Sequence, residues 1–326
     1  MSECEKNSDL LWLQFKSFKM PKMNTIKTTY LIALALAWGL AATVNAQTMY
    51  IGYGWDVGQY GLNGQTINNS LISASELGVG GIAVSGNDVY VIHNYGGTPS
   101  TIEEFTTSGT LVNASLITGL NHADAIAISG NDLFVANYYS GTIGEYSLDG
   151  STINASLITG LHGPEGLTIS GNDLFVANEG AGSNPDGAGT IGEYTTSGAT
   201  VNASLVCGLD IPLGLAISGN NLYVANYNGN ANTVGEYTTS GATVNASLIT
   251  VQSNPSGIAI LGNNLFVLND WVNGTLAEYT LSGALVNPAL ITGLDQAGSI
   301  VIVPEPSASV LLGVGAAGLW LWRRRK

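Results

Sequence analysis

The sequence predicts an all-β fold, a propeller of six blades, and three observations support this prediction. A unit of roughly 43 residues repeats along the chain. Each unit contains four short runs rich in Val, Ile, Thr and Tyr, separated by turn residues. First-strand and fourth-strand runs each occur six times. Four short strands in every repeat are typical of a propeller blade.

The unit at 214–249 shows the expected strands in order. Residues 214–218 form the first strand, and a Gly-Asn turn leads to the second strand at 222–226. Asn and Gly tolerate the positive φ of a tight hairpin. The third strand covers 233–238, and a Thr-Ser-Gly turn leads to the fourth strand at 243–249. First-strand copies begin at 81, 125, 166, 214, 257 and 298.

The two ends of the repeat region are out of phase. The region starts with a second strand at 49–52 and ends with a first strand at 298–302. We therefore expect one shared closing blade, with three N-terminal strands and one C-terminal strand. Such a closure ties the ends together and removes open sheet edges. An open solenoid is the alternative, but it would need capping segments that the repeats lack.

The chain ends on the layout of a sorting signal. An apolar run at 307–322 separates a Pro-Glu-Pro triad from a basic end, and the key residues are Pro304, Glu305, Pro306, Arg323, Arg324 and Arg325. This tail resembles the PEP-CTERM sorting signal. The resemblance implies processing by an exosortase in Gram-negative bacteria that make extracellular polysaccharide. The apolar run predicts a membrane-spanning helix of marginal length, and a permanent tail anchor is the alternative to cleavage.

The N-terminus predicts a secretory signal peptide. Three lysines precede an apolar region at 30–42, and Val44-Asn45-Ala46 offers a small-x-small cleavage site. Met20 or Met23 would give a signal of ordinary length. We therefore expect a leader at 1–46 that uses the Sec machinery, a propeller at 47–303, and the sorting tail at 304–326.

The predicted mature domain has an unusual charge. Residues 47–303 contain 19 Asp and Glu residues but no Lys or Arg. Nucleic acid is therefore excluded as a partner, because phosphate contacts need cations. No motif requires a cofactor, although Ca²⁺ is the ion that such an acidic surface favours. Cys207 is the only cysteine of this region, and we expect it to be a small apolar filler.

Two repeated polar motifs are expected to be structural. One is a carboxylate at a fixed place in the third strand, at Glu104, Glu145, Glu193, Glu236 and Glu278, with Gln59 in the sixth copy. The glutamine argues against an obligatory charge. The other is Asn-x-Ser in the fourth strand, for which we expect a turn or strand-start role.

The repeats resemble those of NHL-type and streptogramin-lyase-type propellers. The resemblance rests on Pro-x-Gly before the first strand, as in Pro164-Glu165-Gly166, and on the Ile-x-Glu-Tyr strand. It covers residues 47–303 loosely. It implies a propeller whose central opening hosts chemistry in lactonase-like and lyase-like members. Enzymes, binders and scaffolds share such folds, so the resemblance leaves the activity open.

The loops of the expected blades divide between two faces. The hairpin face carries the near-identical turns after first and third strands. The variable face carries the loops after second and fourth strands, and all three histidines, His93, His122 and His162, are expected there. Aromatic residues concentrate on it too, at Trp55, Tyr95, Tyr138, Tyr139, Tyr227 and Trp271. Aromatic rings can stack on sugars, so these six residues are candidate polysaccharide-binding residues, with rim packing as the alternative.

A metal site is a second hypothesis for the variable face. His122, Asp124, His162 and Glu165 precede neighbouring first strands and offer nitrogen and oxygen ligands. A metal-assisted lyase or lactonase is therefore the alternative to a binding protein. No nucleophile motif or His-x-x-x-His spacing supports catalysis. We expect an exported, non-catalytic protein of the cell surface or extracellular matrix, in contact with polysaccharide or a surface protein.

Overall fold

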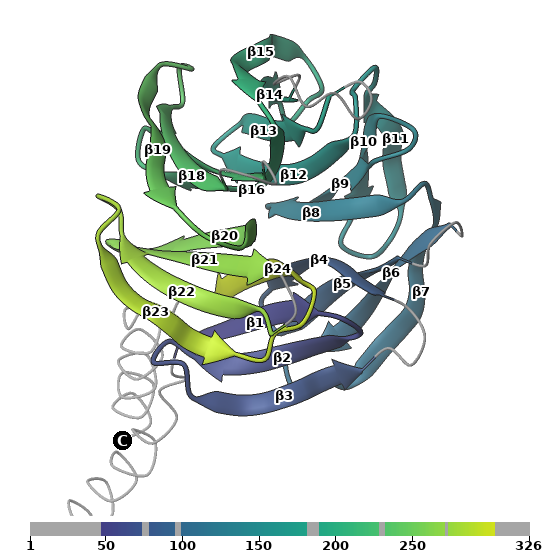
Figure 1. Ribbon diagram of the computed structural model, residues 1–326. Helices are drawn as coiled ribbons and strands as arrows, with labels where there is room; N and C mark the ends of the chain where they lie inside the picture. The colour runs from purple at the N-terminus through teal and green to yellow at the C-terminus, as the bar shows by residue number, and fades with distance from the viewer. Residues whose placement is uncertain are drawn as a thin grey trace, which may run out of the picture. The chain divides into compact units, whose positions relative to one another are not determined.

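The computed structural model describes residues 47–73, 78–94, 99–180, 189–227, 232–270 and 273–303, without the side chain of Asp270. Within these ranges the chain forms six four-stranded sheets. Figure 1 shows the sheets arranged around a central opening, with one strand of each sheet beside it. The predicted six-bladed propeller is confirmed. The expected leader at 1–46 and sorting tail at 304–326 lie outside the described residues.

The strands of each blade follow one another from the inner to the outer edge. Blade 1 contains β24 (Ala297–Val303), β1 (Thr48–Tyr53), β2 (Asp56–Gly61) and β3 (Thr66–Ser73). Blade 2 contains β4 (Gly78–Ser85), β5 (Asp88–Asn94), β6 (Ser100–Thr106) and β7 (Leu111–Leu120). Blade 3 contains β8 (Ala123–Ser129), β9 (Asp132–Asn137), β10 (Thr142–Ser147) and β11 (Thr152–Ile158).

The second half of the propeller repeats this order. Blade 4 contains β12 (Pro164–Ser170), β13 (Asp173–Asn178), β14 (Gly189–Thr195) and β15 (Thr200–Leu209). Blade 5 contains β16 (Ile211–Ser218), β17 (Asn221–Tyr227), β18 (Thr233–Thr238) and β19 (Thr243–Thr250). Blade 6 contains β20 (Asn254–Leu261), β21 (Asn264–Asp270), β22 (Thr275–Thr280) and β23 (Leu285–Thr292).

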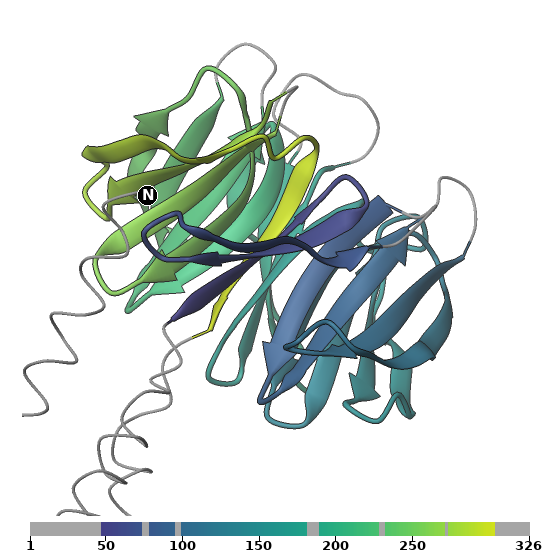
Figure 2. The ribbon, with the colours of Figure 1, turned by 90° about the horizontal axis from the view of Figure 1, so that it is seen from below.

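Blade 1 is the shared closing blade that the sequence predicts. Its strand order is β24-β1-β2-β3, so the C-terminal strand lies on the inner side of the N-terminal strands. The antiparallel pairing runs from Thr48 opposite Val303 to Tyr53 opposite Ala297. Figure 2 shows the yellow C-terminal strand beside the purple N-terminal strands. Pairing of the two ends closes the ring without leaving an inner edge strand exposed.

The hydrophobic core lies between the blades. Leu133 and Val135 of β9 pack with residues of blade 2, whereas Phe134 and Ala136 point the other way and pack with residues of blade 4. All four side chains are at most 1% exposed. A strand buried on both faces needs an apolar residue at nearly every position, which is what the second strands contain. Each blade is therefore stabilised by its two neighbours.

Two repeated motifs meet where one blade contacts the next. The side chain of Asn113 accepts a hydrogen bond from the backbone N–H of Ser115 at 3.0 Å, beside irregular pairing between β6 and β7. The following Leu116 lies on the hairpin turn of blade 3, where a Cβ on Gly150 would overlap the Leu116 carbonyl oxygen. The same contact occurs around the whole ring, at Leu71–Gly109, Leu116–Gly150, Leu157–Gly198, Leu205–Gly241, Leu248–Gly283 and Leu290–Gly64. The Asn-x-Ser and turn-glycine motifs thus position this inter-blade contact.

The repeated third-strand carboxylates also have a structural role. Glu236 is 9% exposed and accepts hydrogen bonds from Asn221 Nδ2 at 2.7 Å and from the Tyr223 hydroxyl at 3.2 Å. At the equivalent place in blade 1, Gln59 donates to the Tyr50 hydroxyl at 3.1 Å. Hydrogen bonding, rather than a fixed charge, is common to both positions.

Blades 2, 3 and 4 carry Asp88, Asp132 and Asp173 where blades 5 and 6 carry asparagine, and blade 3 provides a stability prediction. Asp132 occupies the asparagine position, and the pKa of Glu145 is raised by burial and by the nearby Asp132. Replacing Asp132 with Asn should convert repulsion into a hydrogen bond and raise the free energy of unfolding by about 1 kcal/mol at pH 7. Because a raised carboxyl pKa destabilises the fold only where the group would otherwise ionise, the gain should vanish below about pH 4. Urea unfolding at both pH values measures it.

Asp149 supplies the matched control for that experiment. Its carboxylate accepts hydrogen bonds from the Ser147 hydroxyl and from the backbone N–H of Ser151, and these bonds lower the pKa of Asp149. Asp149→Asn removes the same charge, yet it should give no gain in stability. A gain for Asp132→Asn that persists at pH 3 would contradict the repulsion argument.

Two residues lie elsewhere than the sequence suggested. His93 is 2% exposed inside β5, not in a variable-face loop, because it occupies the position that Asn137, the last residue of the strand, occupies in β9. Burial lowers the pKa of His93 to about 4, so it is neutral near Glu103 at pH 7. Cys207 is exposed on β15 and does not fill a gap in the core. Among the described residues, no helix has the length and hydrophobicity to cross a membrane.

Candidate functional site

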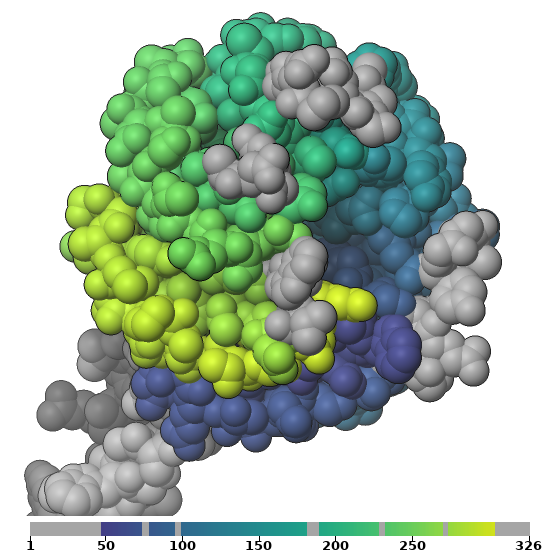
Figure 3. All heavy atoms as spheres, viewed as in Figure 1, coloured from purple at the N-terminus to yellow at the C-terminus, as the bar shows by residue number. Residues whose placement is uncertain are grey.

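The main cavity is the central channel, with a volume of about 640 Å³. Residues of all six inner strands line it, and Tyr138 and Tyr139 lie at its mouth on the variable face. Figure 3 shows that face hollowed near its centre. A cavity of this size suits a small molecule or the end of a polymer chain.

A β-bulge in each inner strand directs one residue toward the channel. The pairing between β8 and β9 shifts between Ala123 and Ala125, which leaves Asp124 as the extra residue. The same shift leaves Glu165 between Pro164 and Gly166 in β12. Bulges are a common means of redirecting a side chain next to a functional site. The sequence places Pro-x-Gly before the first strand, whereas the structure places it within the strand, at the bulge.

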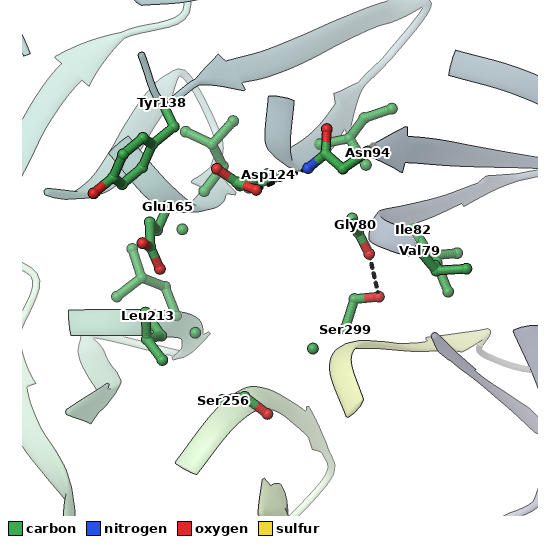
Figure 4. A pocket seen from close by; sticks show the side chains of 18 of the residues that line it. Val79, Gly80, Ile82, Asn94, Asp124, Tyr138, Glu165, Leu213, Ser256 and Ser299 are labelled. Atoms are coloured by element: carbon green, nitrogen blue, oxygen red, sulfur yellow. Dashed lines mark hydrogen bonds between the residues drawn. The ribbon is translucent and has the colours of Figure 1, made fainter. Parts of the chain in front are cut away.

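The bulge residues form a ring that is different in every sector. We call the six equivalent positions the channel ring, and they are Gly80, Asp124, Glu165, Leu213, Ser256 and Gly298. Two neighbouring blades contribute acids, the next two contribute an apolar and a hydroxyl side chain, and the last two contribute glycine. Figure 4 shows the labelled side chains around the open centre of the channel.

A uniform layer lies two residues further along each inner strand. All six positions carry a branched aliphatic side chain, at Ile82, Ile126, Leu167, Leu215, Ile258 and Ile300. These side chains also belong to the inter-blade clusters or pack against them. The channel therefore has a constant apolar layer and a variable ring. Specificity must come from the ring and from the mouth.

Asp124 is held in place by the preceding blade. Asn94 donates from Nδ2 to Asp124 Oδ1 at 2.9 Å and also to the backbone oxygen of Ala123. Asn94 is itself fixed by a hydrogen bond from the Ser100 hydroxyl. The other Asp124 oxygen, Oδ2, is buried and has no hydrogen-bond partner among the described residues. Burial raises the pKa of Asp124 to about 7, although the Asn94 hydrogen bond opposes the rise.

Glu165 and Glu179 extend the acidic sector into blade 4. Burial, together with the nearby carboxylates of Asp124 and Glu179, raises the pKa of Glu165 to about 8. The Tyr138 hydroxyl donates a hydrogen bond to Glu179 Oε2. That bond, together with burial and the nearby carboxylates, raises the pKa of Tyr138, so its hydroxyl stays protonated. The sector collects acidic groups in a domain that has no Lys or Arg to neutralise them.

An aromatic cluster covers the mouth beside the acids. Its members are His122, Tyr138 and Tyr139, and the His122 ring lies 4.4 Å from the Tyr139 ring and 5.7 Å from the Tyr138 ring. His122 has a positive φ of 54°, which is uncommon outside glycine. Its carbonyl accepts the backbone N–H of Tyr138 at 2.9 Å, so the two loops hold each other. Tyr139 is 63% exposed and open to a ligand.

The structure brings together some of the predicted site residues. His122, Asp124, Glu165, Tyr138 and Tyr139 line the channel, with His122 Nε2 at 3.7 Å from Asp124 Oδ1. His162 lines a neighbouring hollow of about 280 Å³ that shares both tyrosines. Nowhere in the described ranges do three or more His, Cys, Asp or Glu side chains cluster as metal ligands.

The remaining candidate residues are scattered or undescribed. Trp55 is 62% exposed in the turn between β1 and β2, and Tyr227 ends β17, but neither lines the channel. Tyr95 and Trp271 lie outside the described residues, as do the sorting-signal residues Pro304 to Pro306 and Arg323 to Arg325.

Sequence reasoning missed part of the channel ring and one supporting residue. Leu213, Ser256 and Asn94 line the cavity but were not identified as candidates. The signal that could have found the first two was the middle position of Pro-x-Gly, which changes from repeat to repeat. Asn94 carries no such signal, because its role depends on the neighbouring blade.

Comparisons with known proteins bear on the two parts of the chain separately. A model of the PEP-CTERM protein-sorting motif matches residues 303–326. The chain carries a PEP-CTERM sorting motif. The motif implies an exported protein with a C-terminal membrane-anchoring signal that an exosortase sorts. No curated protein matches the sequence.

Solved structures similar to this protein support the fold alone. A chain of a nidogen/laminin complex is 14% identical, with a TM-score of 0.67 over 79% of this chain and 98% of that chain. A calcium-binding regucalcin from Agrobacterium tumefaciens is also 14% identical, with a TM-score of 0.52 over 68% of this chain and 76% of that chain. Similarity at this level of identity indicates a shared propeller architecture and does not transfer a function.

Proposed function

We propose that this protein is a non-catalytic binding protein of the cell surface or extracellular matrix, and that its channel mouth holds polysaccharide. The observation that carries the proposal is the aromatic cluster of His122, Tyr138 and Tyr139 at the mouth of the channel. Export by an exosortase route would deliver such a protein to where polysaccharide is found.

The chemistry of the mouth suits a sugar. An exposed ring such as Tyr139 offers a flat apolar surface for the C–H face of a sugar, and Asp124 and Asn94 beside it, with Ser256 across the channel (Figure 4), offer groups that bond hydroxyls. The cavity would accommodate the end of a chain or a short branch. Trp55 and Tyr227 would provide outlying contacts if the polymer extends across the variable face.

Replacing Tyr139 with Ala should weaken retention on the polysaccharide of the producing cell by about tenfold or more, because a stacked ring contributes of the order of 1–2 kcal/mol. The side chain is 63% exposed, so the fold should persist with an unchanged unfolding midpoint. Affinity electrophoresis in gels that contain the polysaccharide measures retention.

Val112→Ala serves as the control for apolar surface. Val112 is 54% exposed on the outer strand β7, away from the channel lining, so its loss should leave retention unchanged. Equal retention of the wild-type protein and Tyr139→Ala would overturn the proposed role of the mouth.

A metal-assisted lyase or lactonase is the second candidate. Two channel carboxyls with pKa values near 7 and 8 favour it, because groups that titrate near neutrality suit proton transfer. His122, Asp124 and Glu165 would be the ligands or bases. Metal analysis of the purified protein separates the candidates: a stoichiometric transition metal supports the enzyme, whereas none, or only loosely held Ca²⁺, supports the binder.

A further inference from the structure

The channel ring carries acidic side chains on one side and glycines on the other, and this asymmetry indicates how a ligand would be oriented. Asp124 and Glu165 occupy two adjacent sectors, whereas Gly298 and Gly80 add no side chain to the ring, and the neighbouring Ser299 hydroxyl donates to the Gly80 carbonyl at 2.7 Å (Figure 4). A Cβ placed on Gly298 would meet no atom within 4 Å, so the channel has room at this position. A ligand that fills the channel would therefore place its bulk toward the glycines and its polar end toward the acids.

The acids lack a protein counter-charge. Residues 47–303 contain no Lys or Arg, and the nearest basic group is His122, whose pKa burial lowers. Asn94 satisfies one oxygen of Asp124, and Oδ2 remains without a partner among the described residues. An uncompensated carboxylate at a buried position is costly, and a cation supplied by a ligand would offset that cost.

The groups around the acids favour an organic cation over a bare metal ion. No set of three metal-ligating side chains is assembled among the described residues. Aromatic rings border the acids instead, and the faces of tyrosine rings attract ammonium groups. The Tyr138 hydroxyl donates its proton to Glu179, so the face of its ring and the acceptor capacity of its oxygen remain available to the ligand.

We propose that the channel binds a sugar that carries a primary ammonium group, with the ammonium between Asp124 and Glu165 and the sugar ring beside Tyr138 and Tyr139. This inference rests on the proposed function and specifies the ligand class: a polysaccharide with free amino groups, such as a deacetylated amino-sugar polymer. Binding would convert the two acids to carboxylates paired with the ligand. The protons that they carry at slightly acidic pH would leave for solvent.

The test compares two probes that differ only in the amine. Purified full-length protein in mild detergent with a metal chelator is titrated calorimetrically at pH 6 with a trimer of glucosamine and with a trimer of N-acetylglucosamine. We expect the free-amine trimer to bind at least about tenfold more tightly, because acetylation removes its charge. Repeating the titration in buffers of different ionisation enthalpy should reveal proton release, because Asp124 and Glu165 titrate near pH 7 and 8 in the free protein.

Three variants locate the binding. Asp124→Asn with Glu165→Gln should lose the preference for the free amine and the proton release. Glu193→Gln removes one negative charge outside the channel lining, at a position where blade 1 carries Gln59, and should change neither. Gly298→Leu starts from a position where a Cβ meets no atom within 4 Å, so its side chain should project into the channel and abolish binding, and the unfolding midpoint checks that the variant is folded.

The outcomes separate this inference from the proposed function. Equal affinity for the two trimers would overturn the ammonium site and would leave polysaccharide binding intact. Binding of neither trimer would also overturn it, and the Tyr139→Ala retention experiment would then decide the proposed function independently. Binding of the free-amine trimer that survives Gly298→Leu would place the site outside the channel and would overturn the inference as well.

Discussion

Replacing Gly150 with Ala should lower the free energy of unfolding by about 3 kcal/mol, because two penalties add at this position. Its φ of +86° disfavours any L side chain. A Cβ there would also overlap the carbonyl oxygen of Leu116 in the neighbouring blade. The atom that the new Cβ would meet belongs to the Leu116 backbone, which cannot rotate away as a side chain can. The overlap is therefore removed only if the two blades move apart. Equilibrium unfolding in urea measures the loss.

Gly160→Ala separates the two penalties. Gly160 belongs to the same blade and has a φ of +76°, but a Cβ there would meet no atom within 4 Å. Gly160→Ala should lower the free energy of unfolding only by the conformational penalty, about 1 kcal/mol. Equal losses for both variants would show that the contact between Leu116 and Gly150 contributes nothing to the packing of the blades.

The double variant Asp124→Asn, Glu165→Gln should be more stable than the wild-type protein at pH 9, by an amount on the order of 3 kcal/mol. The pKa values of these carboxyls are raised to about 7 and about 8 in the folded state. A raised carboxyl pKa means that the folded state holds protons that the unfolded state releases. Stability is therefore full below pH 4 and falls as the pH rises toward 8, and the neutral amides remove that fall.

Thermal unfolding between pH 4 and pH 9 tests the pH dependence. The wild-type midpoint should decline across this range more steeply than that of the double variant, and the two should converge near pH 4. Asp149→Asn controls for the change in net charge: the pKa of Asp149 is lowered rather than raised, so this variant should follow the slope of the wild-type curve between pH 4 and pH 9. Parallel curves for the wild-type protein and the double variant would show that the channel acids ionise freely in the folded state.

The same two carboxylates thus oppose stability and support the proposed binding. In a domain with 19 acidic residues and no Lys or Arg, two adjacent carboxylates in a channel lower the stability of the fold, because no cationic side chain offsets their charge. Residues that lower stability at a cavity are candidates for function, because a better-packed alternative exists at each position. Blades 5 and 6 illustrate such alternatives with Leu213 and Ser256 at the equivalent places.

The sequence determined the architecture of this protein. For most strand ends, the predicted position lies within one or two residues of the observed one. Turn glycines and alternating apolar runs act over a few residues, so their repetition indicates strands, blades and a phase shift at the two ends. That phase shift predicted the closing blade formed by β24 and β1. The sorting motif is equally local, since a Pro-Glu-Pro triad, an apolar run and a basic end are contiguous in the chain.

Only the tertiary structure decided which residues share a site. Asp124 and Glu165 lie one repeat apart in sequence, and the bulges of β8 and β12 direct both toward the channel. His162 occurs in the same kind of loop as His122 in the sequence, yet it lies in a neighbouring hollow, and His93 is buried within β5. The physical reason is that a repeat specifies its own strands through local turns and periodicity, whereas the contents of the channel depend on how six bulges meet after the ring has closed.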